Sequence, residues 1–305
     1  MKVLIIGGSG FIGGGTALRL RQEGEDVTIA SRRPPARHTA LSGLPFIRGD
    51  YVAGDFGVEE LAGFDAVIHA AANDARQRKP DESEAEHLLR ANIEGVPRFF
   101  RAARDAGVKR AVYVGSFYPQ VVPDAIERSP YVRSRLLADQ GARALAADDF
   151  SICSVNPPYI IGDIEHLDTG WLGAHARYAT GGMPEVPLSA PPGGVNFMSV
   201  EALIDAIAGA LRHGENGKAY LVGDENLTFQ EYLNRYRKAA GLPQDIPLRD
   251  EEHPLLPDWS LYAGRGNAAF YMPDAGEAAL LGYRRGDLDQ AFADVVNARK
   301  PVAGA

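Results

Sequence analysis

The feature that most constrains this chain is a glycine-rich turn near its start, between a short apolar stretch and a stretch with helical spacing. Lys2–Ile6 is mostly apolar and predicts a buried strand, and Gly7, Gly10 and Gly13 follow it in the spacing GxxGxxG. Glycine allows a tight turn and, having no Cβ, lets a pyrophosphate approach the backbone. A helix that begins at Phe11 would present N–H groups and the positive end of its dipole to the phosphates. This order of elements predicts a dinucleotide-binding βαβ unit, with a plain glycine turn as the alternative.

Apolar stretches of strand length alternate with helical patterns over the first half of the chain. The predicted strands cover residues 26–30, 44–50, 64–72, 109–116 and 150–155, and the predicted helices cover residues 11–23, 83–107 and 131–145. Strands and helices that alternate at this spacing form a parallel sheet with right-handed crossovers. We therefore expect an α/β fold with a Rossmann-type doubly wound parallel sheet, which binds ligands at the carboxyl ends of its strands.

The alternation breaks after residue 156. Residues 157–194 are rich in proline and glycine, residues 243–273 are rich in proline and aromatic side chains, and helical patterns return over 199–213, 228–241 and 288–298, with one strand over 219–223. We expect residues 1–156 and about 196–223 to form the dinucleotide-binding domain. We expect about residues 157–195 and 224–305 to form a smaller C-terminal substrate-binding cap over the carboxyl edge of the sheet.

The end of the second predicted strand indicates which dinucleotide binds. An acidic side chain at this position would bind the ribose 2′-hydroxyl of NAD, whereas an arginine favours the 2′-phosphate of NADP. Here Ser31 is followed by Arg32 and Arg33, with no acid. An arginine forms charge-assisted, often bidentate hydrogen bonds with a phosphate. We therefore expect NADP in preference to NAD; the alternative is that both arginines are solvated.

The composition excludes several other classes of partner. The 305-residue chain has 32 basic and 40 acidic residues, a net charge of 32 − 40 = −8, which gives no support to binding of nucleic acid or an anionic membrane. No apolar run is long enough to span a membrane, and we expect a cytoplasmic protein with a small-molecule substrate. No spacing of histidine, cysteine or carboxylate residues indicates a metal site. Cys153 and His69 lie in apolar strand patterns and are expected to be buried structural residues.

Several short motifs together resemble one protein family. They are Gly49-Asp50, Ala70-Ala71-Ala72, Asn92 in a predicted helix, Gly115-Ser116, the helical segment from Tyr131 to Arg135, and Asn156-Pro157. With the glycine turn, they resemble the extended short-chain dehydrogenase/reductases, the group named for NAD-dependent epimerases and dehydratases, over nearly the whole chain. The resemblance implies that Asp50 lies beside the adenine and that the three alanines lie under the nicotinamide ribose. The residues expected to bind the cofactor are Gly7, Ser9, Gly10, Phe11, Ile12, Gly13, Ser31, Arg32, Asp50, Ala70, Ala71, Ala72, Asn92 and Pro157.

The resemblance also assigns catalytic residues, with one departure from the family's pattern. Tyr131 stands for the tyrosine that exchanges a proton with the substrate oxygen, and Ser116 would hydrogen-bond the same oxygen. Arg135 stands in place of the lysine of the Tyr-x-x-x-Lys motif, one helical turn after Tyr131. An arginine supplies a cation and hydrogen bonds but cannot relay a proton, because its pKa exceeds about 12. Three alternatives stay open: arginine fills the lysine's role, Tyr118 provides another proton route, or the protein binds NADP without hydride chemistry.

The segment between the expected catalytic residues bears on the reaction. Only 14 residues separate Ser116 from Tyr131, whereas nucleotide-sugar enzymes of this family usually carry a longer segment with acidic and proline residues. The first hypothesis is therefore an NADP-dependent oxidoreductase, a ketone reductase or secondary-alcohol dehydrogenase. The alternatives are a nucleotide-sugar epimerase or dehydratase, and a non-catalytic NAD(P)-binding sensor or regulatory protein.

Aromatic side chains of the cap are candidates for the substrate pocket, although aromatics in a cap more often form its core. The candidates are Tyr118, Tyr159 and Trp171, together with Met183, Phe197 and Tyr262. On resemblance alone, we also expect a homodimer formed through the helices around residues 83–107 and 131–145.

Overall fold

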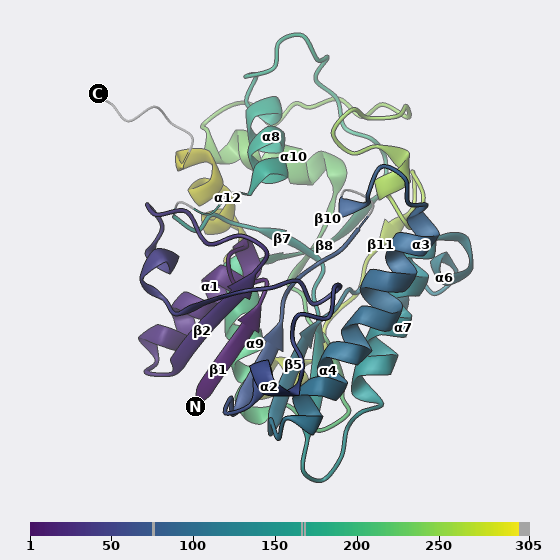
Figure 1. Cartoon of the computed structure of the whole chain (residues 1–305). Coiled ribbons are helices and arrows are strands. Elements are labelled where there is room, and N and C mark those ends of the chain that lie inside the picture. The colour runs from purple at the N-terminus through teal and green to yellow at the C-terminus, as the bar shows by residue number, and fades with distance from the viewer. Residues whose placement is uncertain (75–76, 166, 168, 299–305) are drawn as a thin grey trace.

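The computed structural model describes residues 1–74, 77–165, 167 and 169–298. Its main element is a parallel seven-stranded sheet in the order β3-β2-β1-β4-β5-β6-β9 (Figure 1). These strands are β1 Lys2–Ile6, β2 Asp26–Ser31, β3 Phe46–Arg48, β4 Ala66–His69, β5 Arg110–Val114, β6 Ser151–Asn156 and β9 Ala219–Leu221. The strand order reverses direction next to β1, as in a doubly wound sheet. The predicted fold class is therefore confirmed.

Both faces of the sheet are buried, which explains why its strands are nearly continuous apolar runs. In β1, Val3 and Ile5 pack with helices α1 (Phe11–Gln22) and α9 (Val200–His213) in one core. Leu4 and Ile6 point to the opposite core, which contains side chains of α4 (Gly95–Asp105) and α7 (Pro130–Arg143). Figure 1 shows these two helix layers on either side of the strands.

The long helix predicted over residues 83–107 is a continuous run of three segments. These are α3 Glu84–Leu88, the π-helical turn η3 Leu89–Glu94 and α4. Ser83 caps the run, because its hydroxyl accepts from the Glu86 N–H while the Glu86 carboxylate accepts from the Ser83 N–H. Asn92 lies inside the π-helical turn. Turns of this kind interrupt α-helices mostly at functional sites.

A second, smaller sheet lies beyond the carboxyl edge of the large one. It consists of β7 Tyr159–Ile161, β8 Gly194–Ser199, β10 Glu225–Thr228 and β11 Ala268–Ala269, with β8 at its centre. Helices α8 (Gly170–Ala179), α10 (Phe229–Ala239) and α12 (Leu288–Asn297) pack around this sheet (Figure 1). Of residues 196–223, α9 and β9 lie with the large sheet, whereas β8 lies in the small one.

The remaining short elements connect the larger ones. They are η1 Ala40–Gly43, α2 Val58–Leu61, α5 Tyr118–Val121, α6 Ala125–Arg128, η4 Asp258–Ser260 and α11 Ala275–Leu281. None of the helices in the described ranges has the length and apolarity needed to cross a membrane. Within the same ranges, no group of three or more histidine, cysteine or carboxylate side chains is arranged to hold a metal ion.

Candidate functional site

A cleft of about 1120 Å³ lies between the carboxyl edge of the large sheet and the cap. It brings together residues that the sequence placed far apart in the chain. The predicted site residues that line it are Phe11, Ile12, Ala70, Ala72, Ser116, Tyr118, Tyr131, Arg135, Pro157, Tyr159 and Trp171. The expected catalytic residues therefore share one cavity with residues expected to contact the cofactor.

The glycine turn has the geometry of a phosphate cradle. Gly7 has a φ of 82°, and a Cβ on it would lie 2.7 Å from the Ala71 backbone nitrogen. A Cβ on Gly13 would lie 2.4 Å from the Gly7 carbonyl oxygen, so neither glycine has room for a side chain. Helix α1 starts after Gly10 with no side-chain cap and no acid in its first turn. Its positive end is therefore left for an anion, and the residues present fit a dinucleotide.

The end of β2 lies beside this turn. The Ser9 hydroxyl donates to the Ser31 hydroxyl at 2.8 Å, which links the glycine turn to β2. The Ser31 hydroxyl in turn donates to the Arg33 carbonyl at 2.6 Å. Arg32, between them, is exposed. A cation is thus available at the position where the 2′-phosphate of NADP would be distinguished from the 2′-hydroxyl of NAD.

Asp50 and Asn92, both expected to bind the cofactor, make hydrogen bonds within the protein. The Asp50 carboxylate accepts from the Val52 N–H at 2.9 Å. The buried Asn92 amide donates to the Asn73 carbonyl at 3.2 Å and to the Ser134 hydroxyl at 3.0 Å. Neither residue lines the cleft. Asn92 instead ties the segment after β4 to helix α7, and no sequence pattern predicts these partners.

Ser116 lies just beyond the end of β5 and is almost fully buried. Its hydroxyl oxygen accepts a long hydrogen bond of 3.5 Å from the Tyr118 backbone N–H. A serine hydroxyl has one donor and two acceptor positions. Because the protein contact uses an acceptor position, the hydroxyl proton is left to donate to a ligand oxygen in the cleft.

Tyr131 lies in the first turn of α7, which begins with Pro130 after the capping residue Ser129. The Ser129 hydroxyl accepts from the Val132 N–H, which fixes the start of this helix. The Tyr131 ring stacks on the ring of Tyr262, with a centre-to-centre distance of 4.9 Å and an interplanar angle of 17°. Both rings line the cleft, so Tyr131 faces the cavity with one ring face covered by the cap.

Arg135 is buried and points back toward the end of β5. Its Nη2 donates to the Val114 carbonyl at 2.9 Å, and its Cζ lies 5.5 Å from the centre of the Tyr113 ring. Burial acts to lower the pKa of Arg135, but Tyr113, Tyr131 and other anionisable neighbours outweigh it, so the pKa lies above its ordinary value. The buried Nε has no hydrogen-bond partner among the described residues. The guanidinium is therefore charged and lines the cleft with donor capacity to spare.

The aromatic candidates divide into two groups. Tyr159, Trp171 and Tyr262 line the cleft, whereas Phe197 is fully buried in the cap core and Met183 packs against that core. Much of the remaining wall comes from the segment 254–261, which the sequence marked only as rich in proline and aromatic residues. Sequence reasoning missed this wall because the segment has no periodic pattern that would place it.

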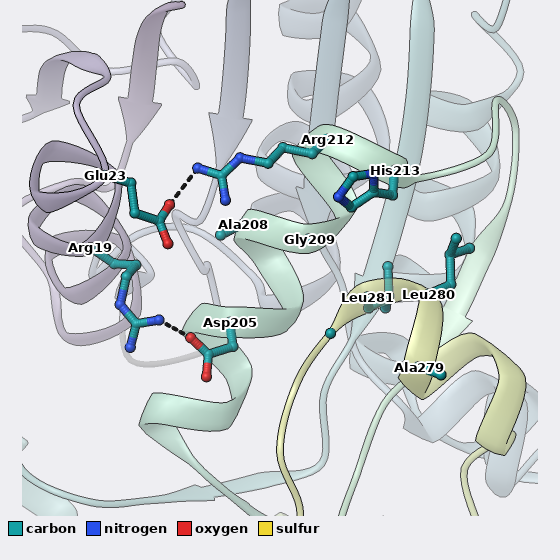
Figure 2. A pocket seen from close by; sticks show the side chains of 11 residues that line it. Arg19, Glu23, Asp205, Ala208, Gly209, Arg212, His213, Ala279, Leu280 and Leu281 are labelled. Carbon is teal, nitrogen blue, oxygen red and sulfur yellow. Dashed lines mark hydrogen bonds and ion pairs between the residues drawn. The ribbon is translucent and has the colours of Figure 1, made fainter.

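A second hollow, of about 470 Å³, lies between α1, α9 and α11 (Figure 2). Arg19 and Arg212 point into it and form ion pairs with Asp205 and Glu23, respectively. It shares no lining residue with the cleft, and the charges drawn there are paired with one another. The ion pairs in this hollow therefore hold α1 against α9. The hollow is not the site predicted from the motifs.

Comparison with known proteins identifies the family. The model of the NAD dependent epimerase/dehydratase family matches residues 3–223, from β1 to just beyond β9. The chain belongs to the NAD dependent epimerase/dehydratase family. The match confirms the family resemblance seen in the motifs, and this protein is an NAD(P)-dependent oxidoreductase or epimerase.

Named relatives within the family include both reductases and epimerases. The 2-alkyl-3-oxoalkanoate reductase of Stenotrophomonas maltophilia is 28% identical over 270 residues, which cover 80% of this chain and 77% of the relative. The UDP-glucose 4-epimerase of Lacticaseibacillus casei is 24% identical over 284 residues, covering 81% and 83%. The family therefore establishes dinucleotide-dependent chemistry. Its named relatives include enzymes of both reduction and epimerisation.

A solved structure of the family has the same fold. The UDP-glucose-4-epimerase from Stenotrophomonas maltophila, with bound NAD and formylated UDP-arabinopyranose, superposes with a TM-score of 0.73 at 20% identity, covering 98% of this chain and 97% of that one. The similarity extends through the cap as well as the large sheet.

Proposed function

We propose that this protein is an NADP-dependent oxidoreductase that interconverts a ketone and a secondary alcohol. The observation that carries the proposal is the shared cleft, in which Ser116, Tyr131 and Arg135 lie with Ala70 and Ala72, the residues expected beneath the nicotinamide. Groups that bind and protonate a carbonyl oxygen must lie beside the carbon that accepts the hydride. The cleft supports this arrangement with residues that directly follow β4 and β5 and with residues of α7.

The reduction divides between the cofactor and three side chains. A bound NADPH, held at the glycine turn, would supply the hydride that converts the carbonyl carbon to the carbinol carbon. Ser116 donates a hydrogen bond to the carbonyl oxygen, and Tyr131 gives that oxygen its phenolic proton. Tyr131 is then reprotonated from solvent, so one ketone, one NADPH and one proton yield one alcohol and one NADP⁺. Arg135 stabilises the transient phenolate by its charge.

The surroundings of Tyr118 argue against it as an alternative proton donor, and the charge of Arg135 supports a role beside Tyr131. The Tyr118 hydroxyl donates to the Tyr159 hydroxyl at 3.2 Å, so its proton is already engaged within the protein. Burial, together with the neighbouring Tyr159, raises the pKa of Tyr118 well above its ordinary value. A phenol that resists ionisation in this way is a poor proton donor to the substrate oxygen. Arg135, one turn from Tyr131, is charged at every physiological pH.

Two further features support NADP and a ketone over the alternatives. Arg32 is exposed at the end of β2, where it can pair with a 2′-phosphate. An epimerase acting on a nucleotide sugar would need cations for the diphosphate. Among the described residues that line the cleft, the permanently charged cations are Arg128 and Arg135, and the proposal assigns the charge of Arg135 to Tyr131.

The test is steady-state oxidation of NADPH by the purified protein with a panel of ketones. The proposal expects turnover by the wild type and a loss of at least about 100-fold in kcat for Tyr131→Phe and about tenfold for Ser116→Ala, with NADPH binding retained. Conversion of UDP-glucose without net NADPH oxidation would favour an epimerase. Tight NADPH binding without turnover on the whole panel would favour a non-catalytic sensor.

A further inference from the structure

Most of the side chains that line the cleft beyond the reacting residues are rings or apolar groups. Tyr118, Tyr159, Trp171 and Tyr262 form one continuous set of aromatic contacts around the cavity. Tyr262 meets Tyr118 edge to face at 4.9 Å, and Tyr159 meets Trp171 edge to face at 6.3 Å. The segment from the opposite wall adds Pro254, Leu255, Leu256, Pro257 and Leu261. Such walls bind apolar and aromatic groups.

Two of the three tyrosine hydroxyl groups on these walls, those of Tyr118 and Tyr159, are already used within the protein. The Tyr118 hydroxyl donates to Tyr159, and the Tyr159 hydroxyl donates to the Ser260 carbonyl at 3.5 Å. Burial is the largest cause that raises the pKa of both phenols. Tyr159 raises the pKa of Tyr118 further, whereas the hydrogen bond from Tyr118 acts to lower the pKa of Tyr159. The walls therefore present neutral ring faces and edges to a ligand, and offer little to hydrogen-bond the many hydroxyl groups of a sugar.

The charges around the cleft disfavour an anionic ligand. The lining carboxylates are Asp74, Glu84 and Asp258, and the lining cations among the described residues are Arg128 and Arg135. His175, which also lines the cleft, adds no charge at neutral pH, because burial lowers its pKa to about 4. The resulting net charge of 2 − 3 = −1 repels a carboxylate or diphosphate ligand.

We infer that the substrate of this cleft is an uncharged ketone or secondary alcohol whose bulk is aromatic or alicyclic rings. The inference rests on the proposed function and names its substrate class. The cleft volume of about 1120 Å³ exceeds the range of about 300–1,000 Å³ typical of a single ligand site, so there is room for a nicotinamide and for a substrate with more than one ring. Tyr262 and Trp171 are the specificity-determining residues, because Tyr262 stacks on Tyr131 and Trp171 extends the aromatic wall from Tyr159.

The experiment compares ketones that keep the same reacting methyl ketone. Acetone, acetophenone and 2-acetonaphthone increase in ring content, and 4-acetylbenzoate adds a carboxylate to acetophenone. With NADPH fixed, we expect kcat/KM to rise at least about tenfold from acetone to 2-acetonaphthone, since ring burial stabilises the bound state. We expect 4-acetylbenzoate to be at least about threefold poorer than acetophenone. Equal rates for acetone and 2-acetonaphthone, or a preference for 4-acetylbenzoate, would overturn the inference.

Variants of the aromatic wall test the same point. Tyr262→Ala and, independently, Trp171→Ala should raise KM for 2-acetonaphthone by about tenfold and raise KM for acetone less. Leu248→Ala is the matched control, because Leu248 is an apolar cap residue that is 55% exposed and does not line the cleft. Loss of 2-acetonaphthone affinity in the control to the same degree would contradict the assignment.

Calorimetric titration of the NADP⁺-loaded protein separates this inference from the proposed function. If no ketone is reduced but 2-acetonaphthone binds at least about tenfold more tightly than acetone, the proposed function fails and the substrate class stands. If ketones are reduced with no advantage from rings, the function stands and the substrate class fails.

Discussion

Arg135 rests on the face of Tyr113, with its guanidinium carbon 5.5 Å from the ring centre, while its Nη2 donates to the carbonyl of the next residue, Val114. Tyr113 is fully buried in β5, so strand and helix together hold the arginine in place. Cation–π contacts of desolvated groups are worth about 2 kcal/mol. Tyr113 is thus a positioning residue for the cation that replaces the family's lysine.

Substitution of Tyr113 should therefore affect turnover through Arg135. Tyr113→Leu removes the ring and is expected to lower kcat at least about tenfold, whereas Tyr113→Phe keeps the ring and should retain most of the activity. In an Arg135→Met background, Tyr113→Leu should cause little further loss, because the two residues act as one unit. Additive losses in the double variant would show that Tyr113 acts only through stability.

Tyr113→Phe also makes a prediction about stability. The Tyr113 hydroxyl is buried with no hydrogen-bond partner in the described part of the chain. Removing an unsatisfied buried hydroxyl eliminates a desolvation cost of about 1–3 kcal/mol. Thermal unfolding should show an unchanged or higher Tm for Tyr113→Phe. A marked fall in Tm would mean that the hydroxyl has a partner that stabilises the fold.

His69 should make the protein less stable in mild acid. It is fully buried among Tyr51, Phe99, Phe100 and Tyr113, and desolvation, with Arg135 as the next cause, lowers its pKa to about 3. Between pH 6.5 and pH 3 the unfolded chain binds a proton at this residue and the folded protein does not. The contribution of His69 to the free energy of unfolding is therefore fully present above pH 6.5. It falls with decreasing pH, by about 2 kcal/mol down to pH 5.

His69→Phe should reduce this acid sensitivity. Both His69 ring nitrogens lack hydrogen-bond partners among the described residues, so a phenyl ring loses no polar contact there. Denaturant unfolding at pH 7 and pH 5 measures the change. His175→Phe is the comparison: its ring nitrogens contact the Tyr232 hydroxyl at 2.7 Å and the Leu255 carbonyl at 2.8 Å, so this substitution should destabilise at both pH values. An unchanged pH dependence in His69→Phe would contradict the account.

Gly13→Ala should damage the glycine turn itself. The added Cβ would lie 2.4 Å from the Gly7 carbonyl oxygen, a contact that requires backbone movement. Overpacking of this kind costs about 1–3 kcal/mol, and it would displace the N–H groups expected to bind the pyrophosphate. Gly43→Ala is the matched control, because nothing lies within 4 Å of its Cβ position. Equal effects on Tm and NADPH affinity in the two variants would contradict the geometry.

Arg32→Ala should remove the preference for NADPH. The lost charge-assisted contact with the 2′-phosphate is worth about 1.5–3 kcal/mol, so the Kd for NADPH should rise about 10- to 100-fold while the Kd for NADH stays the same. Fluorescence titration of both dinucleotides measures this, with NADH as the internal control. Tighter binding of NADH than of NADPH by the wild type would refute the preference for NADP.

The sequence predicted the large sheet well, because its strands are buried on both faces and read as apolar runs between helical patterns. Helix α8 was not predicted, since Gly170 and Gly173 and the prolines nearby obscure the spacing of its buried residues Leu172, Ala176 and Ala179. The small sheet was also missed, because β8 pairs with strands that are far from it in sequence.

The candidate site likewise has residues that motifs predict and residues that only the folded structure brings together. Motif spacing placed Ser116, Tyr131 and Arg135 in one cleft, because strand ends and helix starts meet at the carboxyl edge of a parallel sheet. The residues that hold Arg135 and Tyr131 in place do so through tertiary contacts that no local sequence pattern encodes. Tyr113 lies under Arg135 and Tyr262 lies over Tyr131 only after the chain has folded.

The central claim is that the cleft transfers hydride to a ketone with Tyr131 as the proton donor. The most direct measurement is incubation with 2-acetonaphthone and NADPH carrying deuterium at both C4 positions, followed by mass spectrometry of the alcohol. The account predicts one deuterium on the carbinol carbon in the wild-type product, and at least about 100-fold slower label transfer with Tyr131→Phe. An alcohol without deuterium, or equal label transfer by the wild type and Tyr131→Phe, would contradict it.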